Sequence, residues 1–220
     1  MFDAIAPRYD LLNHLLSAGI DRRWRERAIR SLGLTGRETV LDVCTGTADV
    51  ALQARAAARV VGVDFAGAML ACGRRKVEAQ GEAGRVTLVR GDATALPVRD
   101  GSVDAVTVAF GIRNVERPER ACAEMARTMR RSARLAILEF GVPRIPGISR
   151  LYRWYFTQML PRVGRLISGH SVAYAYLPAS VGAFPPPSTF VSMLEAAGFT
   201  DVRADSLTLG IVYLYTARKL

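Results

Sequence analysis

Short apolar runs and helix-like patterns alternate through the middle of the chain. The apolar runs predict strands near 39–44, 59–64, 86–90, 104–110 and 134–140. Apolar residues at helical spacing predict helices between them, near 48–57, 67–80 and 117–130. Strands that alternate with helices in this way favour an α/β fold with a doubly wound, mostly parallel sheet.

The two ends of the chain follow other patterns. Further helices are predicted near 3–17, 21–32 and 147–167, and after a cap at Ser188. Two strand runs finish the chain, at 201–208 and 211–217. We therefore expect one domain over 1–220 that has an N-terminal helical cover at 1–33, a helical cap insertion at 143–185 and a C-terminal antiparallel hairpin.

Length and cysteine content narrow the class of protein. At 220 residues the chain is long enough for a full hydrophobic core. It has no uncharged apolar run of the roughly 18 residues that a membrane span needs, and its N-terminus lacks the pattern of a signal peptide. Cys44, Cys72 and Cys122 show neither a metal-ligand spacing nor a disulfide framework, so we expect no metal and a cytoplasmic location.

The net charge of +10 permits contact with an anionic surface, either nucleic acid or lipid headgroups. Between Phe140 and Leu194 there is no acidic residue, and the first half of that stretch holds Arg144, Arg150, Arg153, Arg162 and Arg165. An overall bias toward arginine explains this equally well. The aromatic residues around Trp154 suit either a packed cap helix or a helix that lies at a membrane interface.

The segment Val40–Asp49 and the run Val60–Asp64 predict one βαβ unit with a nucleoside-type site at its strand ends. Gly46 lets the backbone approach a ligand, because a Cβ there would fill the space. Asp64, at the tip of the second strand, is placed to accept hydrogen bonds from both ribose hydroxyls. A purely structural strand-to-helix turn is the alternative.

The charges around this turn indicate which nucleoside-type ligand it binds. A dinucleotide site needs G-x-G-x-x-G, whereas this turn has Gly46, Ala48 and Ala51, with Asp42 and Asp49 on either side. Carboxylates repel a diphosphate but suit a ligand that carries an ammonium and a sulfonium. The turn therefore predicts an S-adenosylmethionine site, with expected contacts from Asp42, Gly46, Thr47, Asp64, Met69, Asp92 and Ala93.

Two later strand ends carry further candidates. Asp92 follows the third strand, where its carboxylate would accept from the adenine amino group and the Ala93 N–H would meet a ring nitrogen; an Asp-capped turn is the alternative. Phe110 to Val115 closes the fourth strand, where the substrate should meet the methyl donor. Arg113 and Asn114 there suit an oxyanion; otherwise Arg113 pairs with Glu116, and Asn114 caps the next helix.

Three separated motifs resemble the menaquinone/ubiquinone-biosynthesis C-methyltransferase family. They are Tyr9–Asn13 with Ser17–Gly19 and Arg22–Arg25, then Phe110–Val115, then Tyr174–Ser180 with Phe184-Pro185. The resemblance covers essentially the whole chain. It implies a class I, Rossmann-like methyltransferase fold and a demethylmenaquinol acceptor.

The resemblance also implies roles for individual residues. Arg113, Asn114, Tyr9 and His14 are candidates for catalysis, and Asn13, Phe110, Tyr174 and Tyr176 for binding the quinol. The two histidines, His14 and His170, are equally consistent with ordinary surface residues. Partners would be a lipid-borne quinol and, peripherally, the anionic inner face of a membrane, with no nucleic acid; a homodimer is compatible with the sequence.

Two departures from the family pattern matter. Asp21 stands where the family usually has His, and Arg130–Ala133 replaces a Lys-Pro-Gly-Gly turn before the fifth strand. Two rival functions therefore stay open. One is an RNA or other small-molecule methyltransferase, which the basic charge permits. The other is a non-catalytic protein of the same fold that serves as a partner in a quinone-synthesis assembly.

Overall fold

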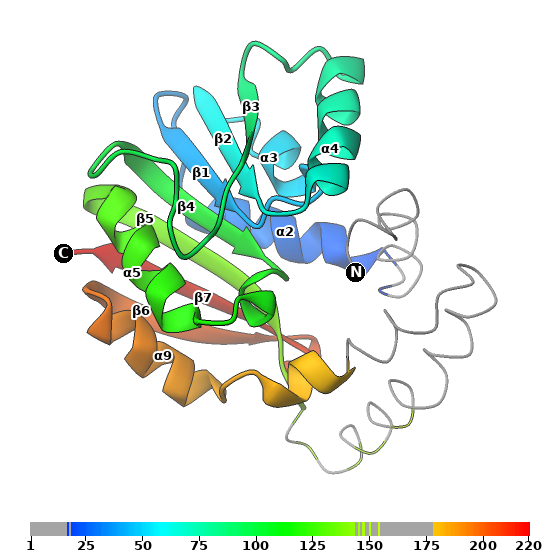
Figure 1. The fold of residues 1–220 in the computed structure, drawn as a ribbon. Helices are drawn as coiled ribbons and strands as arrows, with labels where there is room; N and C mark the ends of the chain where they lie inside the picture. Colours follow the sequence, from blue (N-terminus) through cyan, green and yellow to red (C-terminus); the bar gives the residue numbers. More distant parts are fainter. Residues whose placement is uncertain are drawn as a thin grey trace.

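The computed structural model describes residues 19–143 and 178–220, together with residues 17, 145, 147, 150 and 154. Its centre is a seven-stranded sheet in the order β3-β2-β1-β4-β5-β7-β6 (Figure 1). Five strands are parallel: β1 (Thr39–Val43), β2 (Arg59–Asp64), β3 (Val86–Arg90), β4 (Val103–Ala109) and β5 (Met129–Phe140). β7 (Val212–Lys219) runs antiparallel to β5 and to β6 (Phe199–Leu207). The predicted doubly wound sheet with a C-terminal antiparallel hairpin is confirmed.

Helices cover both faces of this sheet. The helices α2 (Ile20–Ser31), α3 (Asp49–Gln53) and α4 (Gly67–Ala79) lie on one face, and α5 (Pro118–Thr128) and α9 (Pro187–Ala196) on the other (Figure 1). Alternate residues of one strand point to opposite faces. Val40 accordingly belongs to the same apolar cluster as Trp24 and Leu70, whereas its neighbour Leu41 belongs to the cluster that contains Phe190 on the far side. Each such buried side chain stabilises the fold by about 1.5–3 kcal/mol.

Several element boundaries differ from the sequence prediction. β5 begins at Met129 rather than near 134, because its pairing with β4 starts at Met129, breaks, and resumes at Arg134. Ser132 lies in this irregular stretch with a φ of 62°, the left-handed conformation that a glycine would adopt more easily. α9 begins at Pro187, where proline suits the first turn of a helix, so Ser188 is not its cap.

Two expected helices cannot be compared in this way. The helix at 3–17 lies outside the described residues apart from position 17, and so does most of the one at 147–167. Among the described residues, no helix is both long enough and apolar enough to cross a membrane.

The parallel register brings the ends of the first four strands to one edge of the sheet. Val43 pairs with Val63 of β2 and with Val108 of β4, and Asp64 pairs with Arg90 of β3. The turns that follow these strands therefore emerge side by side. This edge is where ligands bind in open parallel sheets.

A carboxylate is buried in the middle of the sheet, one residue before the end of β1. Asp42 is 1% exposed and accepts hydrogen bonds from the hydroxyls of Thr45 (2.5 Å) and Thr107 (2.8 Å). Loss of hydration on burial raises the pKa of Asp42 from 3.8 to about 6, although the two hydroxyls partly offset the effect. Between pH 3.8 and about 6, the Asp42 side chain is therefore protonated to a greater extent in the folded protein than in the unfolded chain.

This raised pKa predicts a pH-dependent stability. The contribution of Asp42 to folding is most favourable below pH 3.8 and is lost as the pH rises through about 6. Asp42→Asn carries no charge, so wild type should lose about 2 kcal/mol of unfolding free energy relative to this variant between pH 4 and 7.5. Urea unfolding of both proteins at several pH values measures the difference, and parallel pH curves would contradict the prediction.

Candidate functional site

A cleft of about 430 Å³ follows the carboxyl edge of the sheet across four strands. It is lined by residues from the turns after β1, β2, β3 and β4 and from the start of α4. They are Cys44, Gly46, Val63, Asp64, Phe65, Ala66, Met69, Gly91, Asp92, Ala93, Thr94, Ala109, Phe110, Gly111, Asn114, Val115, Glu116 and Arg117. This set contains six of the predicted cofactor and substrate contacts: Gly46, Asp64, Met69, Asp92, Ala93 and Phe110. It also contains Asn114, which was predicted as catalytic.

The turn after β1 is joined to the end of β2 by a hydrogen bond. The Gly46 N–H donates to Asp64 Oδ2 at 2.8 Å, and the Ala66 N–H donates to Asp64 Oδ1 at 2.8 Å. Gly46 has a φ of 57°, and a Cβ built on it would meet no atom within 4 Å. The open space is what the sequence led us to expect, and the left-handed backbone, which side chains rarely adopt, is a second reason for glycine at this position.

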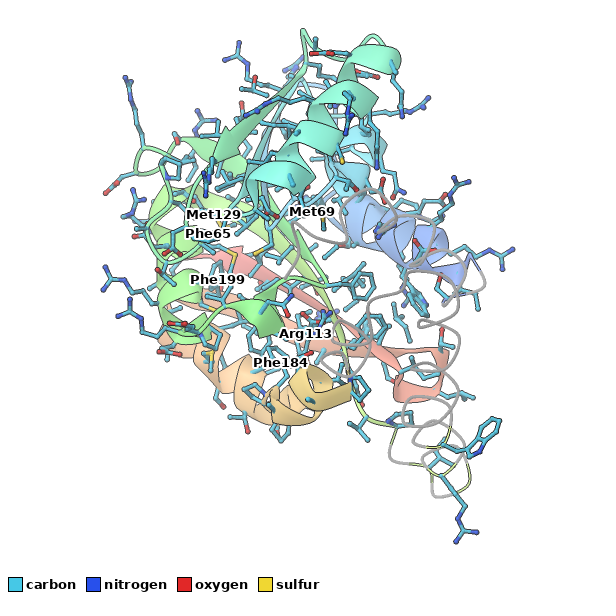
Figure 2. All side chains as sticks on the ribbon, turned by 45° about the vertical axis from the view of Figure 1, so that its right-hand side comes forward. Phe65, Met69, Arg113, Met129, Phe184 and Phe199 are labelled. Atoms are coloured by element: carbon cyan, nitrogen blue, oxygen red, sulfur yellow. The ribbon has the colours of Figure 1, made fainter. Side chains whose placement is uncertain are left out.

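Phe65 follows Asp64 directly and is 71% exposed, although it lines the cleft. The Arg90 guanidinium lies 5.7 Å from its ring centroid, and Arg90 Nε donates to the Phe65 carbonyl at 3.1 Å. Phe65 and Met69 line the same cleft, and Figure 2 shows both above Arg113, which is labelled near Phe184. Sequence reasoning missed Phe65; its signal was a large apolar residue directly after an acid at a strand end.

Asp92 and Ala93 form the turn after β3. Asp92 Oδ1 accepts from the backbone N–H of Thr94 (2.7 Å) and from its hydroxyl (2.9 Å), and these bonds lower the pKa of Asp92. The Asp-capped turn named as the alternative is therefore present, and the same residue lines the cleft. None of the described residues donates to Asp92 Oδ2 or accepts from the Ala93 N–H. Both roles are thus compatible.

Asp42, Thr47 and Asp49 lie behind the turn instead of among the described residues that line the cleft. Asp42 accepts hydrogen bonds from the hydroxyls of Thr45 and Thr107. The Thr47 hydroxyl accepts from Lys76 Nζ at 3.1 Å. Asp49 contacts both Lys76 and Arg25. The pair of carboxylates expected beside an ammonium and a sulfonium therefore supports the turn from behind, and Asp64 and Asp92 are the acids that face the cleft.

The turn after β4 forms the other end of the cleft. Phe110 has a φ of 60° and is held there by packing against Phe140, with ring centroids 4.6 Å apart, and Trp24, at 6.1 Å. A Cβ on Gly111 would lie 2.3 Å from the Cβ of Cys44, so only glycine lets the two turns meet. Strained backbone of this kind is often found at binding sites.

Asn114 lines this end of the cleft. Its Oδ1 is buried and has no hydrogen-bond partner among the described residues. Leaving such a group unpaired costs about 1–3 kcal/mol. The N-cap of α5 is Arg117 and no side chain caps that helix, so the alternative in which Asn114 caps it is wrong.

Arg113 is held by a buried acid. Its Nη1 donates to Glu139 Oε1 (2.7 Å) and to the Phe110 carbonyl (2.5 Å), and its backbone N–H donates to Glu139 Oε2 (3.2 Å). The arginine side chain is 7% exposed and the glutamate 0%. The acid that pairs with Arg113 is therefore Glu139 of β5, not Glu116. A lone acid in the apolar run before Phe140 was the signal, because a buried charge requires a counter-charge.

The remaining predicted site residues lie outside the described residues. They are Tyr9, Asn13, His14, Tyr174 and Tyr176. Arg113 connects to the segment after them, because its Nε is 3.4 Å from the Ser180 hydroxyl in a short helical stretch at 178–183.

The ubiE/COQ5 methyltransferase family matches residues 1–219. The chain is 47% identical, over its whole length and 94% of the relative, to the ubiquinone/menaquinone biosynthesis C-methyltransferase UbiE of Citrifermentans bemidjiense. It is 48% identical to the demethylmenaquinone methyltransferase of Thermus thermophilus, with 98% of each chain covered.

Solved structures share the fold at low identity. A SAM-dependent methyltransferase from Aquifex aeolicus has a TM-score of 0.61 at 20% identity, with 89% of each chain covered. The [4+2]-cyclase SpnF has a TM-score of 0.70 at 17% identity, with 100% of this chain and 93% of that one covered. The fold alone therefore does not determine the reaction. The sequence match over 1–219 does determine the family: this chain belongs to the ubiE/COQ5 methyltransferase family.

Proposed function

We propose that this protein transfers the methyl group of S-adenosylmethionine to a ring carbon of a prenylated quinol, with demethylmenaquinol as the acceptor and menaquinol as the product. One observation carries the proposal. A single cleft has nucleoside-type acceptors at one end, Asp64 and Asp92, and an uncommitted amide, Asn114, at the other. The names of the relatives supply the acceptor class.

The residues of the first end fit the cofactor. Asp64 lines the cleft at the tip of β2, where its carboxylate would accept hydrogen bonds from the ribose hydroxyls. Asp92 Oδ2 would accept from the adenine amino group, and the Ala93 N–H would donate to a ring nitrogen. Phe65 offers an exposed aromatic face beside them. S-adenosylmethionine, when bound, supplies a methyl group on a sulfonium, which is a good leaving group.

The residues of the second end fit an ionised quinol. Removal of a proton from the ring hydroxyl spreads negative charge onto the neighbouring carbon, which then attacks the methyl group as the carbon–sulfur bond breaks. The ring proton at that carbon is lost afterwards. Asn114 would accept from the hydroxyl through Oδ1 and then, after rotation of the amide, donate to the oxyanion through Nδ2. Arg113, whose charge is compensated by Glu139, would hold the turn that carries Asn114. The roles of Tyr9, His14 and the quinol-binding residues remain sequence predictions.

A lipid-borne acceptor requires contact with a membrane, and we propose an anionic one. Exposed apolar side chains gather where α2, the β5 end and the β6–β7 connection meet: Ile20, Val142 and Leu209. Trp24 Nε1 bonds Thr208 Oγ1 at 2.9 Å, and the Gly141 N–H bonds the Ile211 carbonyl at 2.9 Å, so these segments adjoin. Leu209 is 60% exposed with a φ of 60°, an unfavourable backbone for a side chain that gains little from packing.

The ribose contact is tested by Asp64→Ala. The variant should bind S-adenosylmethionine about 1.5–3 kcal/mol more weakly, because an ionised acceptor is lost. Asp64→Asn keeps one acceptor oxygen and should fall between the variant and wild type. Calorimetry measures both affinities, and an unchanged affinity in folded Asp64→Ala would contradict the placement.

The transfer itself is tested with labelled methyl donor and a membrane lipid extract, followed by mass identification of the lipid that gains a methyl group. Wild type should methylate a demethylated quinol, and Asn114→Ala should reduce turnover by about two orders of magnitude at normal cofactor affinity. Asn114 is the sharper probe than Arg113, because Arg113→Ala would leave Glu139 buried and unpaired at a cost of about 3–5 kcal/mol. Methylation of RNA but not of lipid would favour the rival function.

Membrane contact is tested by flotation with neutral and anionic vesicles. Wild type should float only with anionic lipid and less at high salt, because each basic residue near the surface adds about 1 kcal/mol. Leu209→Ser and the charge reversal Arg150→Glu should each reduce flotation without lowering the melting temperature. A fall in melting temperature for Leu209→Ser with unchanged flotation would instead show that this chain covers the side chain.

A further inference from the structure

A line of alternating charges joins α2 to the turn after β1. Arg25 Nη1 lies 2.6 Å from Asp21 Oδ2 and 3.2 Å from Asp49 Oδ2. Lys76 of α4 contacts the other oxygen of Asp49 and donates to Thr47 Oγ1 at 3.1 Å. Asp49 is the first residue of α3 and directly follows the turn that contains Gly46. The network therefore ends on the cofactor turn.

Arg25 also contacts the turn after β4. Its guanidinium lies 5.9 Å from the centroid of the Phe110 ring, which lines the cleft. Both turns on which Arg25 acts, through Asp49 and through Phe110, carry residues that line the cleft. One cation of α2 is thus linked to both turns that border the cleft. One is the turn after β1, which carries Cys44, and the other is the turn after β4, which carries Gly111.

Stability alone gives a poor account of this arrangement. The Arg25 side chain is 6% exposed and that of Asp21 is 4% exposed, so both charges have lost most of their hydration. Arg25 Nε is buried and finds no acceptor among the described residues. Apolar residues of similar volume often replace such buried pairs at no cost in stability. A role in fixing the position of the two turns accounts for the buried charges of Arg25 and Asp21.

We propose that Arg25 is a positioning residue that sets the distance between the two turns and thereby couples α2 to cofactor affinity. The inference rests on the proposed function, because it takes S-adenosylmethionine as the ligand of this end of the cleft. It also assigns a part to Asp21, the residue that departs from the family pattern. Asp21 binds Arg25 and accepts from the Ser17 hydroxyl at 2.7 Å, so it orients the guanidinium.

The test measures binding of S-adenosylhomocysteine, the demethylated product, by calorimetry together with the melting temperature. Arg25→Met should bind about tenfold more weakly, and Asp49→Asn should show a similar loss. Arg25→Lys keeps the charge and should recover part of the affinity. In methyl transfer, the variants should raise the KM for the cofactor and leave kcat nearly unchanged.

Two matched variants separate positioning from simple structural roles. Arg134 fastens the other end of α2 by donating to the Leu32 carbonyl at 2.8 Å, so Arg134→Met tests whether any loosened α2 weakens binding. It should bind like wild type. The double variant Asp21→Asn with Arg25→Met removes the charge pair within α2 and should stay weak, because Asp49 and Phe110 still lack the Arg25 guanidinium between them.

The inference fails if Arg25→Met binds within twofold of wild type. It fails also if the double variant with Asp21→Asn restores the affinity, because Arg25 then only neutralises Asp21. Equal losses in Arg134→Met and Arg25→Met would show a general effect of helix docking. Failure of the wild-type chain to bind either S-adenosylhomocysteine or S-adenosylmethionine would contradict the proposed function itself, which distinguishes the two failures.

Discussion

The Gly46 N–H and the Asp64 carboxylate lie 2.8 Å apart across β1 and β2, and the geometry of the cleft depends on this hydrogen bond. Parallel pairing fixes where the two strands end, but it leaves the turns beyond them free to move. The bond holds the left-handed glycine against the acid, so the open space in front of Gly46 faces the same cleft as the carboxylate. An ionised acceptor makes such bonds stronger than neutral ones.

Buried charges surround the cleft instead of lining it. On one side Arg25 and Lys76 compensate Asp21 and Asp49, and on the other Arg113 compensates Glu139. Asp42 lacks a direct cationic partner among the described residues and shows the consequence in its raised pKa. Asp64 and Asp92 are the acids that line the cleft, and each accepts hydrogen bonds from backbone N–H groups of the turns that carry them.

The sheet and the convergence of the cleft residues were predictable from the sequence, because strand ends in a parallel sheet share one edge. Asp64, Asp92 and Asn114 follow apolar runs, so their convergence needed only the count of strands. The Glu139 partner of Arg113 was not predictable in the same way, because it depends on the register of β4 with β5. That register contains a break between Met129 and Arg134, in the stretch that stands in place of the family's turn. Contacts of this kind come from tertiary packing, which local periodicity does not encode.

Both buried arginines, Arg25 and Arg113, contact Phe110, and these contacts help the cleft to keep its shape. Arg25 lies over the Phe110 ring from α2, and Arg113 binds the Phe110 carbonyl from within the same turn. Phe110 itself has an unfavourable left-handed backbone and is not a glycine, so surrounding contacts must hold it. A turn fixed by two cations and by rings of Trp24 and Phe140 cannot relax toward the cofactor end. Such preorganisation is what a methyl transfer needs, because holding donor and acceptor at about 3–3.5 Å supplies much of the rate.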